Sequence, residues 1–276
     1  MKTKTLQLPH QQVAYYESKG TGPAVILIHG NSSSGLSYQR QIESSLGDKY
    51  RLVALDLPGH GDSDRASDVS QYSLPGYAAV VAAAAQALNM PDAILVGWSL
   101  GGHIALEAHN LLPQAKGFVI FGTPPLAFPP AMQDAFLPNP AVNIGFQVDV
   151  TKEEAAAYAQ SFFAPQSFVA PNASIDLQHF IADILRTDGN ARAGLAASIK
   201  PNGYQDEVQV VANLTRPLAI LHGECEQLVS APYIRSLTMP TLWRNQIQII
   251  PGAGHAPHVE QPDKFNTLIE EFITSK

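Results

Sequence analysis

Ser99 stands in the stretch VGWSLGGH, where glycines flank a serine on both sides. An apolar run precedes this stretch and a helical pattern follows it, so it reads as a turn from a strand into a helix. GWSLG matches the G-x-S-x-G pattern, in which such a turn exposes a serine hydroxyl above the carboxyl end of a parallel strand. We therefore expect Ser99 to be a nucleophile. An ordinary glycine-rich turn is the alternative, and a base, an acid and an oxyanion site elsewhere in the chain would exclude it.

A serine hydroxyl attacks only when a base removes its proton, and a histidine is the usual base. His255 lies in GAGHAPH, directly after the last predicted strand, where the order Ser, acid, His places the base in this type of site. His258 is its rival, and the position in the loop favours His255. Four other histidines lie at strand ends or turns, and we expect structural roles for them: His29, His60, His103 and His222.

The acid that orients the histidine should follow the penultimate strand. HGECEQLVS, residues 222–230, offers Glu226 and Glu224, and we favour Glu226. An aspartate is usual at this position, and glutamate is one methylene longer. The loop that carries Glu226 must therefore stand further from His255 if the carboxylate is to stabilise the protonated imidazole. Cys225, between the two glutamates, reads as a small packed residue.

An oxyanion site needs two backbone N–H groups directed at the carbonyl oxygen. One should come from Leu100, which follows the nucleophile at the start of a helix. The other should come from Asn31, in the loop HGNSSSG after an early buried strand. The neighbouring loop LDLPGHGDSD, residues 55–64, is expected to pack beside the site without a catalytic role.

Short apolar runs alternate with helical patterns along most of the chain, which is typical of βαβ units and a largely parallel sheet. An opening pair of strands is predicted at 5–8 and 13–18, followed by strands at 24–29, 50–56, 92–98, 116–122, 217–223 and 245–252. Helices are predicted at 36–46, 74–89, 100–112, 230–238 and 262–274.

The alternation stops between residues 124 and 205. This segment begins with a proline-rich stretch, which neither a helix interior nor a central strand tolerates. Helical patterns follow in TKEEAAAYAQSFF, ASIDLQHFIADILRT and NARAGLAASI. Seven of the 11 phenylalanines lie in this segment, which indicates either packing onto the main domain or the lining of a pocket. We therefore predict an α/β core at 1–123 and 206–276 with a helical cap at 124–205.

The charge and the apolar content of the chain indicate which kinds of binding partner to expect. The net charge is −7 and no basic stripe occurs, which disfavours nucleic acid and anionic membranes as partners. No apolar run is long enough to span a bilayer, and no signal-peptide pattern occurs in MKTKTLQLPHQQ, so we expect a cytoplasmic protein that acts on a small molecule. The histidine spacings do not match a metal site, so we expect neither a metal nor another cofactor. The sequence does not indicate an oligomeric state.

Taken in order, HGNSSSG, LDLPGHGDSD, GWSLGGH, GTPP, HGECEQLV and GAGHAP resemble the motifs of the α/β-hydrolase superfamily along the whole chain. Within it the chain resembles the metal-independent N-acyl-homoserine lactonases, which degrade bacterial quorum-sensing signals. AAAYAQSFF, RTDGNAR and the glutamate acid carry this closer resemblance, which is patchy in the cap.

The resemblance implies the α/β-hydrolase fold, with Ser99, His255 and Glu226 as a triad and with Asn31 and Leu100 as oxyanion donors. It also suggests that the Tyr158 hydroxyl reaches bound substrate, although a packing tyrosine is the equal alternative. Trp98, beside the nucleophile, is a further candidate for substrate contact.

The leading hypothesis is therefore a serine hydrolase that opens the ring of N-acyl-homoserine lactones. A general carboxylesterase or a carbon–carbon bond hydrolase would use the same residues, and fold alone does not decide between them. A ligand sensor that keeps the pocket without turnover is a third hypothesis, which the complete set of nucleophile, acid and base disfavours.

Overall fold

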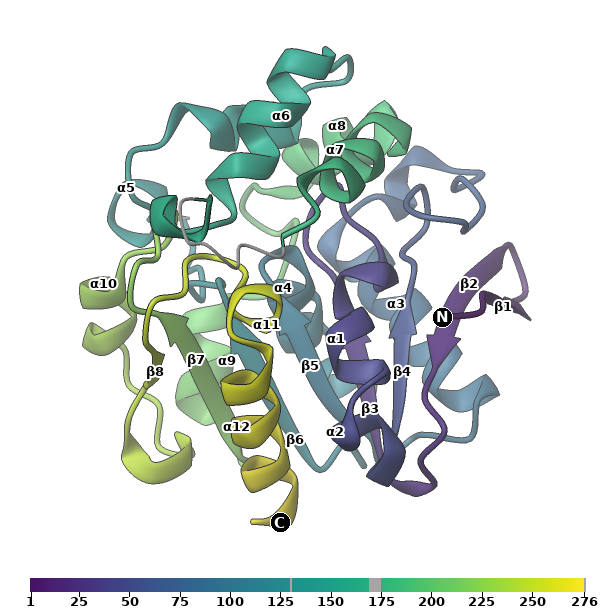
Figure 1. Cartoon of the computed structure of the whole chain (residues 1–276), viewed down its shortest axis with the longest axis vertical. Coiled ribbons are helices and arrows are strands. Elements are labelled where there is room, and N and C mark those ends of the chain that lie inside the picture. Colours follow the sequence, from purple (N-terminus) through teal and green to yellow (C-terminus); the bar gives the residue numbers. More distant parts are fainter. Residues whose placement is uncertain (130, 169–174, 276) are drawn as a thin grey trace.

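One eight-stranded sheet forms the centre of the computed structural model, which describes residues 1–129, 131–168 and 175–275 (Figure 1). Its order is β1-β2-β4-β3-β5-β6-β7-β8, antiparallel at the first two pairings and parallel from β4 onward. The strands are β1 (Lys4–Gln7), β2 (Gln12–Glu17), β3 (Gly22–Ile28), β4 (Tyr50–Leu55), β5 (Ile94–Trp98), β6 (Gly117–Phe121), β7 (Leu218–Gly223) and β8 (Gln248–Ile250). All eight predicted strands are confirmed.

Helices cover both faces of the sheet. In the view of Figure 1, α1 (Gln39–Ile42), α2 (Ser45–Lys49) and α12 (Pro262–Thr274) lie in front, and α3 (Leu74–Ala87), α4 (Leu100–Glu107) and α9 (Glu207–Asn213) lie behind. The central strands β5, β6 and β7 are buried along their whole length, as expected for parallel strands between two helical layers. The predicted α/β-hydrolase fold class is thus confirmed.

Several helix boundaries differ from the prediction. The predicted helix 36–46 is a 3₁₀ turn at Gly35–Tyr38 followed by α1 and α2, because Ser44 starts α2 anew by accepting a hydrogen bond from the Leu46 N–H. The predicted helix 100–112 continues after Glu107 only as a 3₁₀ turn at Ala108–Asn110. α10 (Ala231–Ser236) matches its prediction, whereas α9 and α11 (Pro257–Glu260) were not predicted. The helices in the described part of the chain include none that is long and apolar enough to cross a membrane.

The segment between β6 and α9 forms a helical layer over the carboxyl ends of the strands, at the top of Figure 1. Its helices, which we call the cap helices, are α5 (Met132–Ala135), α6 (Lys152–Ser161), α7 (Leu177–Arg186) and α8 (Gly189–Ser198). α6 and α7 lie within their predicted helical stretches, and α8 begins one residue before its own, which spans 190–199. Residues 173 and 174 of the second stretch fall outside the described residues. Pro130, residues 169–174 and Lys276 fall outside them too, and the boundaries 124 and 205 stay a prediction.

Buried polar contacts join the cap to the loop that follows β3. The Asn31 side chain donates to the carbonyl of Gly145 at 2.6 Å, and the Ser34 hydroxyl donates to Asp183 Oδ2 at 2.6 Å. A buried hydrogen bond to a charged group, such as the one to Asp183, contributes more to stability than a hydrogen bond between two neutral groups. The position of the cap is therefore linked directly to the loop in which the second oxyanion donor is expected.

Arg192 in α8 is the main polar anchor within the cap. It is 3% exposed, and its guanidinium donates to the carbonyls of Gln147 at 2.6 Å, Val148 at 2.9 Å and Ile184 at 3.1 Å. Burial lowers the pKa of Arg192, which reflects the desolvation of its charge. The hydrogen bond to the Ile184 carbonyl is buried and those to Gln147 and Val148 are partly buried, so removal of the guanidinium should destabilise the cap.

We predict that Arg192→Met destabilises the protein by about 2 kcal/mol, because the buried Ile184 carbonyl loses a donor, at about 1–3 kcal/mol, and two partly buried hydrogen bonds are lost with it. Urea unfolding followed by circular dichroism measures this change. Arg235→Met is the matched control, because Arg235 is exposed and its loss should shift stability by less than about 0.5 kcal/mol. Equal unfolding free energies for the two variants would contradict the anchor role.

Candidate active site

The turn between β5 and α4 holds Ser99 in a rarely populated backbone conformation. Its φ is 52° and its ψ is −117°, a left-handed geometry that strains a residue with a side chain. Hydrogen bonds hold the strained residue: the Ser99 N–H donates to the Phe121 carbonyl at 2.8 Å, and the Thr123 hydroxyl donates to the Ser99 carbonyl at 2.8 Å. The predicted strand-turn-helix context of Ser99 is thus present.

The motif glycines are required by the closeness of backbone around this turn. A Cβ on Gly97 would collide with the Gly101 carbonyl, and a Cβ on Gly101 would collide with the Ile28 carbonyl of β3. Backbone atoms in a packed sheet cannot move aside as a flexible side chain can. Only glycine at both positions lets α4 start close enough to the sheet to present Ser99 at its carboxyl edge.

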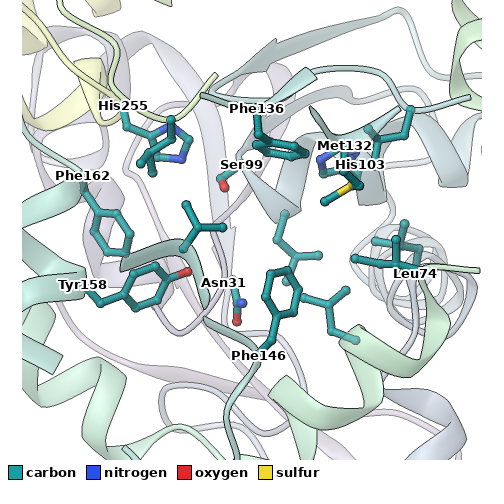
Figure 2. Close-up of a pocket in the computed structure, with 16 residues that line it drawn as sticks. Asn31, Leu74, Ser99, His103, Met132, Phe136, Phe146, Tyr158, Phe162 and His255 are labelled. Atoms are coloured by element: carbon teal, nitrogen blue, oxygen red, sulfur yellow. The ribbon is translucent and has the colours of Figure 1, made fainter. Parts of the chain in front are cut away.

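A cavity between the sheet and the cap helices contains the predicted nucleophile and base together (Figure 2). Its walls are mostly apolar. The core contributes Leu74, Leu100 and Leu228, and the segment between β6 and β7 contributes Leu126, Met132, Phe136, Val142, Phe146, Tyr158, Phe162, Leu195 and Ile199. Four polar residues complete the lining: Asn31, Ser99, His103 and His255. Such a cavity with few polar groups suits a substrate with an apolar part and one reacting polar group.

His255 forms a buried pair with Glu226. Its Nδ1 lies 2.9 Å from Oε2 and 3.1 Å from Oε1 of the carboxylate, and the two side chains are 3% and 2% exposed. Oε1 also accepts a hydrogen bond from the Leu228 N–H at 2.8 Å. Burial alone would raise the pKa of Glu226, but the His255 charge and these hydrogen bonds outweigh it and lower the pKa. Glu226 is therefore held as a carboxylate that fixes the Nδ1–H tautomer of His255 and leaves Nε2 for the cavity.

The two rival residues lie elsewhere. Glu224 is exposed, and its carboxylate accepts a hydrogen bond from the Gly252 N–H at 2.9 Å on the outside of the loop. His258 is fully buried, with neither ring nitrogen hydrogen-bonded to any described residue, and its ring packs against Trp98 and Tyr38 at centroid distances of 4.8 and 4.9 Å. Among the described residues, only His255 of the two candidate bases lines the cavity.

Leu100 and Asn31, the predicted oxyanion donors, both line the cavity beside Ser99. Among the described residues, neither backbone N–H has a backbone hydrogen-bond acceptor, which leaves both groups available to a ligand. The side chain of Asn31 is used structurally, since it donates to Gly145 and its Oδ1 accepts from the Ser32 hydroxyl at 3.2 Å. The role of both residues as donors stays a prediction.

Tyr158 lines the cavity, and Figure 2 shows its hydroxyl directed inward, toward Asn31. Its ring packs edge-on against Phe162 at 4.7 Å, and burial raises the pKa of its hydroxyl. Both alternatives for Tyr158 are compatible with this arrangement, because its ring packs in the cap and its hydroxyl faces the cavity. Contact with substrate stays a prediction.

Trp98 is the other candidate for substrate contact. It is 1% exposed and is absent from the described cavity lining. Its indole N–H donates to the carbonyl of His255 at 2.8 Å, and its ring packs against Phe162, Phe180 and His258. The indole N–H thus bonds to the loop that carries His255, and contact of Trp98 with substrate stays a prediction.

Sequence reasoning missed most of the apolar lining. The enrichment of phenylalanine in 125–205 was the available signal, but only Phe136, Phe146 and Phe162 line the cavity. Phe163 and Phe180 pack inside the cap, so both interpretations of the enrichment hold for different residues. His103, expected to be structural, also lines the cavity. No group of three or more His, Cys, Asp or Glu that could hold a metal ion occurs within the described residues.

Comparison with known proteins agrees with this architecture. A model of the alpha/beta hydrolase family matches residues 25–268, and the chain belongs to this family. Sequence relatives of the chain are esterases, and the chain is a hydrolase that acts on esters. The predicted superfamily is confirmed.

Particular relatives fall into two groups. A mutant of the N-acyl homoserine lactonase AidH, solved with N-hexanoyl homoserine, matches with a TM-score of 0.92 and 32% identity over 99% of this chain and 96% of that one. The pimeloyl-(acyl-carrier protein) methyl ester esterase of Xylella fastidiosa is 28% identical, over 95% of this chain and 99% of that protein. The corresponding esterase of Xanthomonas campestris pv. campestris is 30% identical, over 93% and 97%. The resemblance to the lactonases is thus confirmed, alongside similarity to a methyl ester esterase.

The imidazole of His258, which is buried and has no hydrogen-bond partner among the described residues, should make the stability of the protein depend on pH. Burial lowers its pKa well below 6.5, so the unfolded chain binds a proton that the folded protein rejects. This contribution is complete above about pH 6.5 and is lost as pH falls below it, at up to about 1.4 kcal/mol per pH unit. We predict that His258→Phe loses less stability than wild type between pH 7.5 and 5.5, as measured by urea unfolding at each pH.

His10→Phe is the matched control, because His10 is exposed and should keep the wild-type dependence on pH. An unchanged pH dependence in His258→Phe would mean that His258 is not held neutral by the fold.

Proposed function

We propose that this protein is a serine hydrolase that opens the lactone ring of N-acyl-homoserine lactones to give N-acyl-homoserines. The observation that carries the proposal is the cavity in which Ser99 and His255 lie together, with Glu226 bonded to His255 from behind. The apolar walls suit an acyl chain, and the similarity to the lactonase AidH supports this choice among esters.

In the proposed reaction, the Ser99 Oγ attacks the ring carbonyl carbon while His255 Nε2 takes its proton. The charge that develops on the carbonyl oxygen is stabilised by the backbone N–H groups of Leu100 and Asn31. The carbon–oxygen bond of the ring then breaks, and His255 returns its proton to the ring oxygen, which becomes a hydroxyl. Glu226 stabilises the imidazolium in both steps because its carboxylate stays ionised.

The leaving hydroxyl remains attached to the acyl group, so the acyl-enzyme carries the whole substrate. Water then attacks the ester carbon, and His255 takes a proton from the water. Ser99 leaves with that proton, and the product is N-acyl-homoserine. The mechanism uses side chains and backbone groups of this chain alone, with the Tyr158 hydroxyl available to the amide or ring of the substrate.

A carboxylesterase that acts on an acyl methyl ester is the second candidate. The relatives from Xylella and Xanthomonas favour it, because they match the chain over nearly its full length under the name of a methyl ester esterase. The same three residues would serve it without change. The difference lies in the leaving group, which departs as methanol from a methyl ester and stays tethered in a lactone.

We predict that Glu226→Gln lowers kcat by at least about a hundredfold, because it removes the charge opposite the imidazolium and the acceptor that sets its tautomer. Steady-state hydrolysis of a 4-nitrophenyl ester measures the change, with Ser99→Ala as the inactive reference. Glu224→Gln is the matched control and should keep kcat within about twofold, since Glu224 bonds only to the loop at Gly252. The reverse pattern would move the acid to Glu224.

The substrate proposal predicts a dependence on chain length. Each buried CH₂ contributes about 0.8 kcal/mol, close to fourfold in binding, so kcat/KM should rise with acyl length until the cavity ends and then level off. Ring opening across N-acyl-homoserine lactones of increasing length, followed by acid release or mass spectrometry, measures this. Aryl and methyl esters are run beside them. Rapid ester hydrolysis without opening of any lactone would favour the carboxylesterase instead.

A further inference from the structure

A second histidine–glutamate pair borders the cavity. His103 lies on α4, one turn after Ser99, and is 9% exposed. Its Nδ1 is 2.8 Å from Oε2 and 2.9 Å from Oε1 of Glu207, whose side chain is fully buried. The arrangement repeats that of His255 and Glu226. In Figure 2, His255 and His103 lie on opposite sides of Ser99.

The fold holds Glu207 firmly. It is the first residue of α9, where the helix dipole favours a negative charge. Its Oε2 accepts a hydrogen bond from the Leu126 N–H at 2.7 Å, and its own N–H donates to the Leu126 carbonyl at 2.8 Å. The carboxylate therefore has a fixed position, and it fixes the ring of His103 by accepting the Nδ1–H.

The other ring nitrogen of His103, Nε2, does not bond to Glu207. No described residue forms a hydrogen bond with Nε2, and the residue lines the cavity beside apolar neighbours such as Leu126 and Met132. The proposed reaction does not need this nitrogen, because His255 serves Ser99. A polar atom oriented by a buried carboxylate in an apolar wall is an arrangement that a ligand group can complete.

We propose that His103, oriented by Glu207, is a specificity residue that hydrogen-bonds a hydroxyl or keto oxygen on the acyl chain of the substrate. This inference rests on the proposed lactonase function. With Nδ1–H donated to Glu207, neutral imidazole presents Nε2 as an acceptor for a hydroxyl, and imidazolium presents Nε2–H as a donor to a keto oxygen. An unsubstituted chain makes neither contact.

Distance along the helix points to a position on the chain. Residues four apart on a helix are separated by roughly 6 Å along its axis. In an extended N-acyl-homoserine lactone, five bonds join the ring carbonyl carbon to the third carbon of the acyl chain. An extended chain spans about 3.3–3.6 Å for every three bonds, so these two carbons are roughly 6 Å apart. Because Ser99 and His103 both line the cavity, an oxygen at the third carbon is the first substituent to test.

The test compares N-hexanoyl, N-(3-hydroxyhexanoyl) and N-(3-oxohexanoyl) homoserine lactones in wild type and His103→Phe. The readout is the ratio of kcat/KM for each oxygenated lactone to that for the unsubstituted lactone, so any general loss of activity cancels. We expect the larger of the two wild-type ratios to fall by about three- to tenfold in His103→Phe, which is the size of one net hydrogen bond. Glu207→Gln should lower the same ratio, since it removes the charged acceptor that orients the ring.

Glu107→Gln is the matched control. Glu107 is a buried residue on the same helix whose carboxylate accepts a hydrogen bond from the Gln205 N–H, and it does not belong to the described cavity lining. It should keep the wild-type ratios. A purely structural His103 would change the three rates together, and unchanged ratios in His103→Phe would overturn the proposal. If circular dichroism shows that His103→Phe is unfolded, His103→Leu, which matches the neighbouring wall residues, replaces it under the same criteria.

Failure of the lactonase function is recognised separately. If wild type opens no lactone, the comparison moves to 4-nitrophenyl 6-hydroxyhexanoate and 4-nitrophenyl heptanoate, in which a hydroxyl replaces a methyl at the corresponding distance. A preference for the hydroxy ester that His103→Phe removes would retain the role of His103 in an esterase. The same ratio in both proteins, or hydrolysis of neither ester, would overturn it.

Discussion

The left-handed backbone at Ser99 is the constraint on which the rest of the site depends. A residue with a side chain adopts φ near 52° only when its surroundings compensate the strain. Here the surroundings are the buried strand β5, the carbonyl of Phe121 and the hydroxyl of Thr123, all of which bond or pack at the turn. Glycines next to the turn remove the steric obstacles, so the strain is supported by the core of the sheet and not by the cap.

The histidines of this protein show how surroundings decide chemistry. His255 and His103 each face a buried carboxylate, so each keeps an oriented ring with one nitrogen toward the cavity. His258 has no such partner, and burial lowers its pKa so that it behaves as a neutral aromatic ring among Tyr38 and Trp98. A histidine with a buried carboxylate partner is thus a candidate base (His255) or a candidate recognition group (His103). The histidine without one, His258, packs as an aromatic ring.

Much of the core could be predicted from the sequence, because local patterns determine it. The buried strands are largely apolar runs, and the GWSLG motif marks the turn, although the glycine at 101 is required by a contact with β3. The cap could be recognised only by its proline-rich start and its helical patterns. Which of its phenylalanines face the cavity depends on how α6 and α7 pack together, and no local pattern encodes that. The surroundings of Trp98 could not be predicted for the same reason, since its contacts come from the end of α6, from α7 and from the loop of His255.

The pairing of His103 with Glu207 shows this limit most clearly. More than one hundred residues separate the two, and the intervening chain forms β6, the cap helices and the start of α9. Glu207 reaches His103 because α9 packs beside α4 on the same face of the sheet, which is a property of the topology. The same topology places the cap over loop 30–34, where Asn31 and Ser34 bond to it. A shift of the cap would therefore move the apolar wall and the expected oxyanion donor together, so the shape of the cavity and the polarity at Ser99 are set by one packing arrangement.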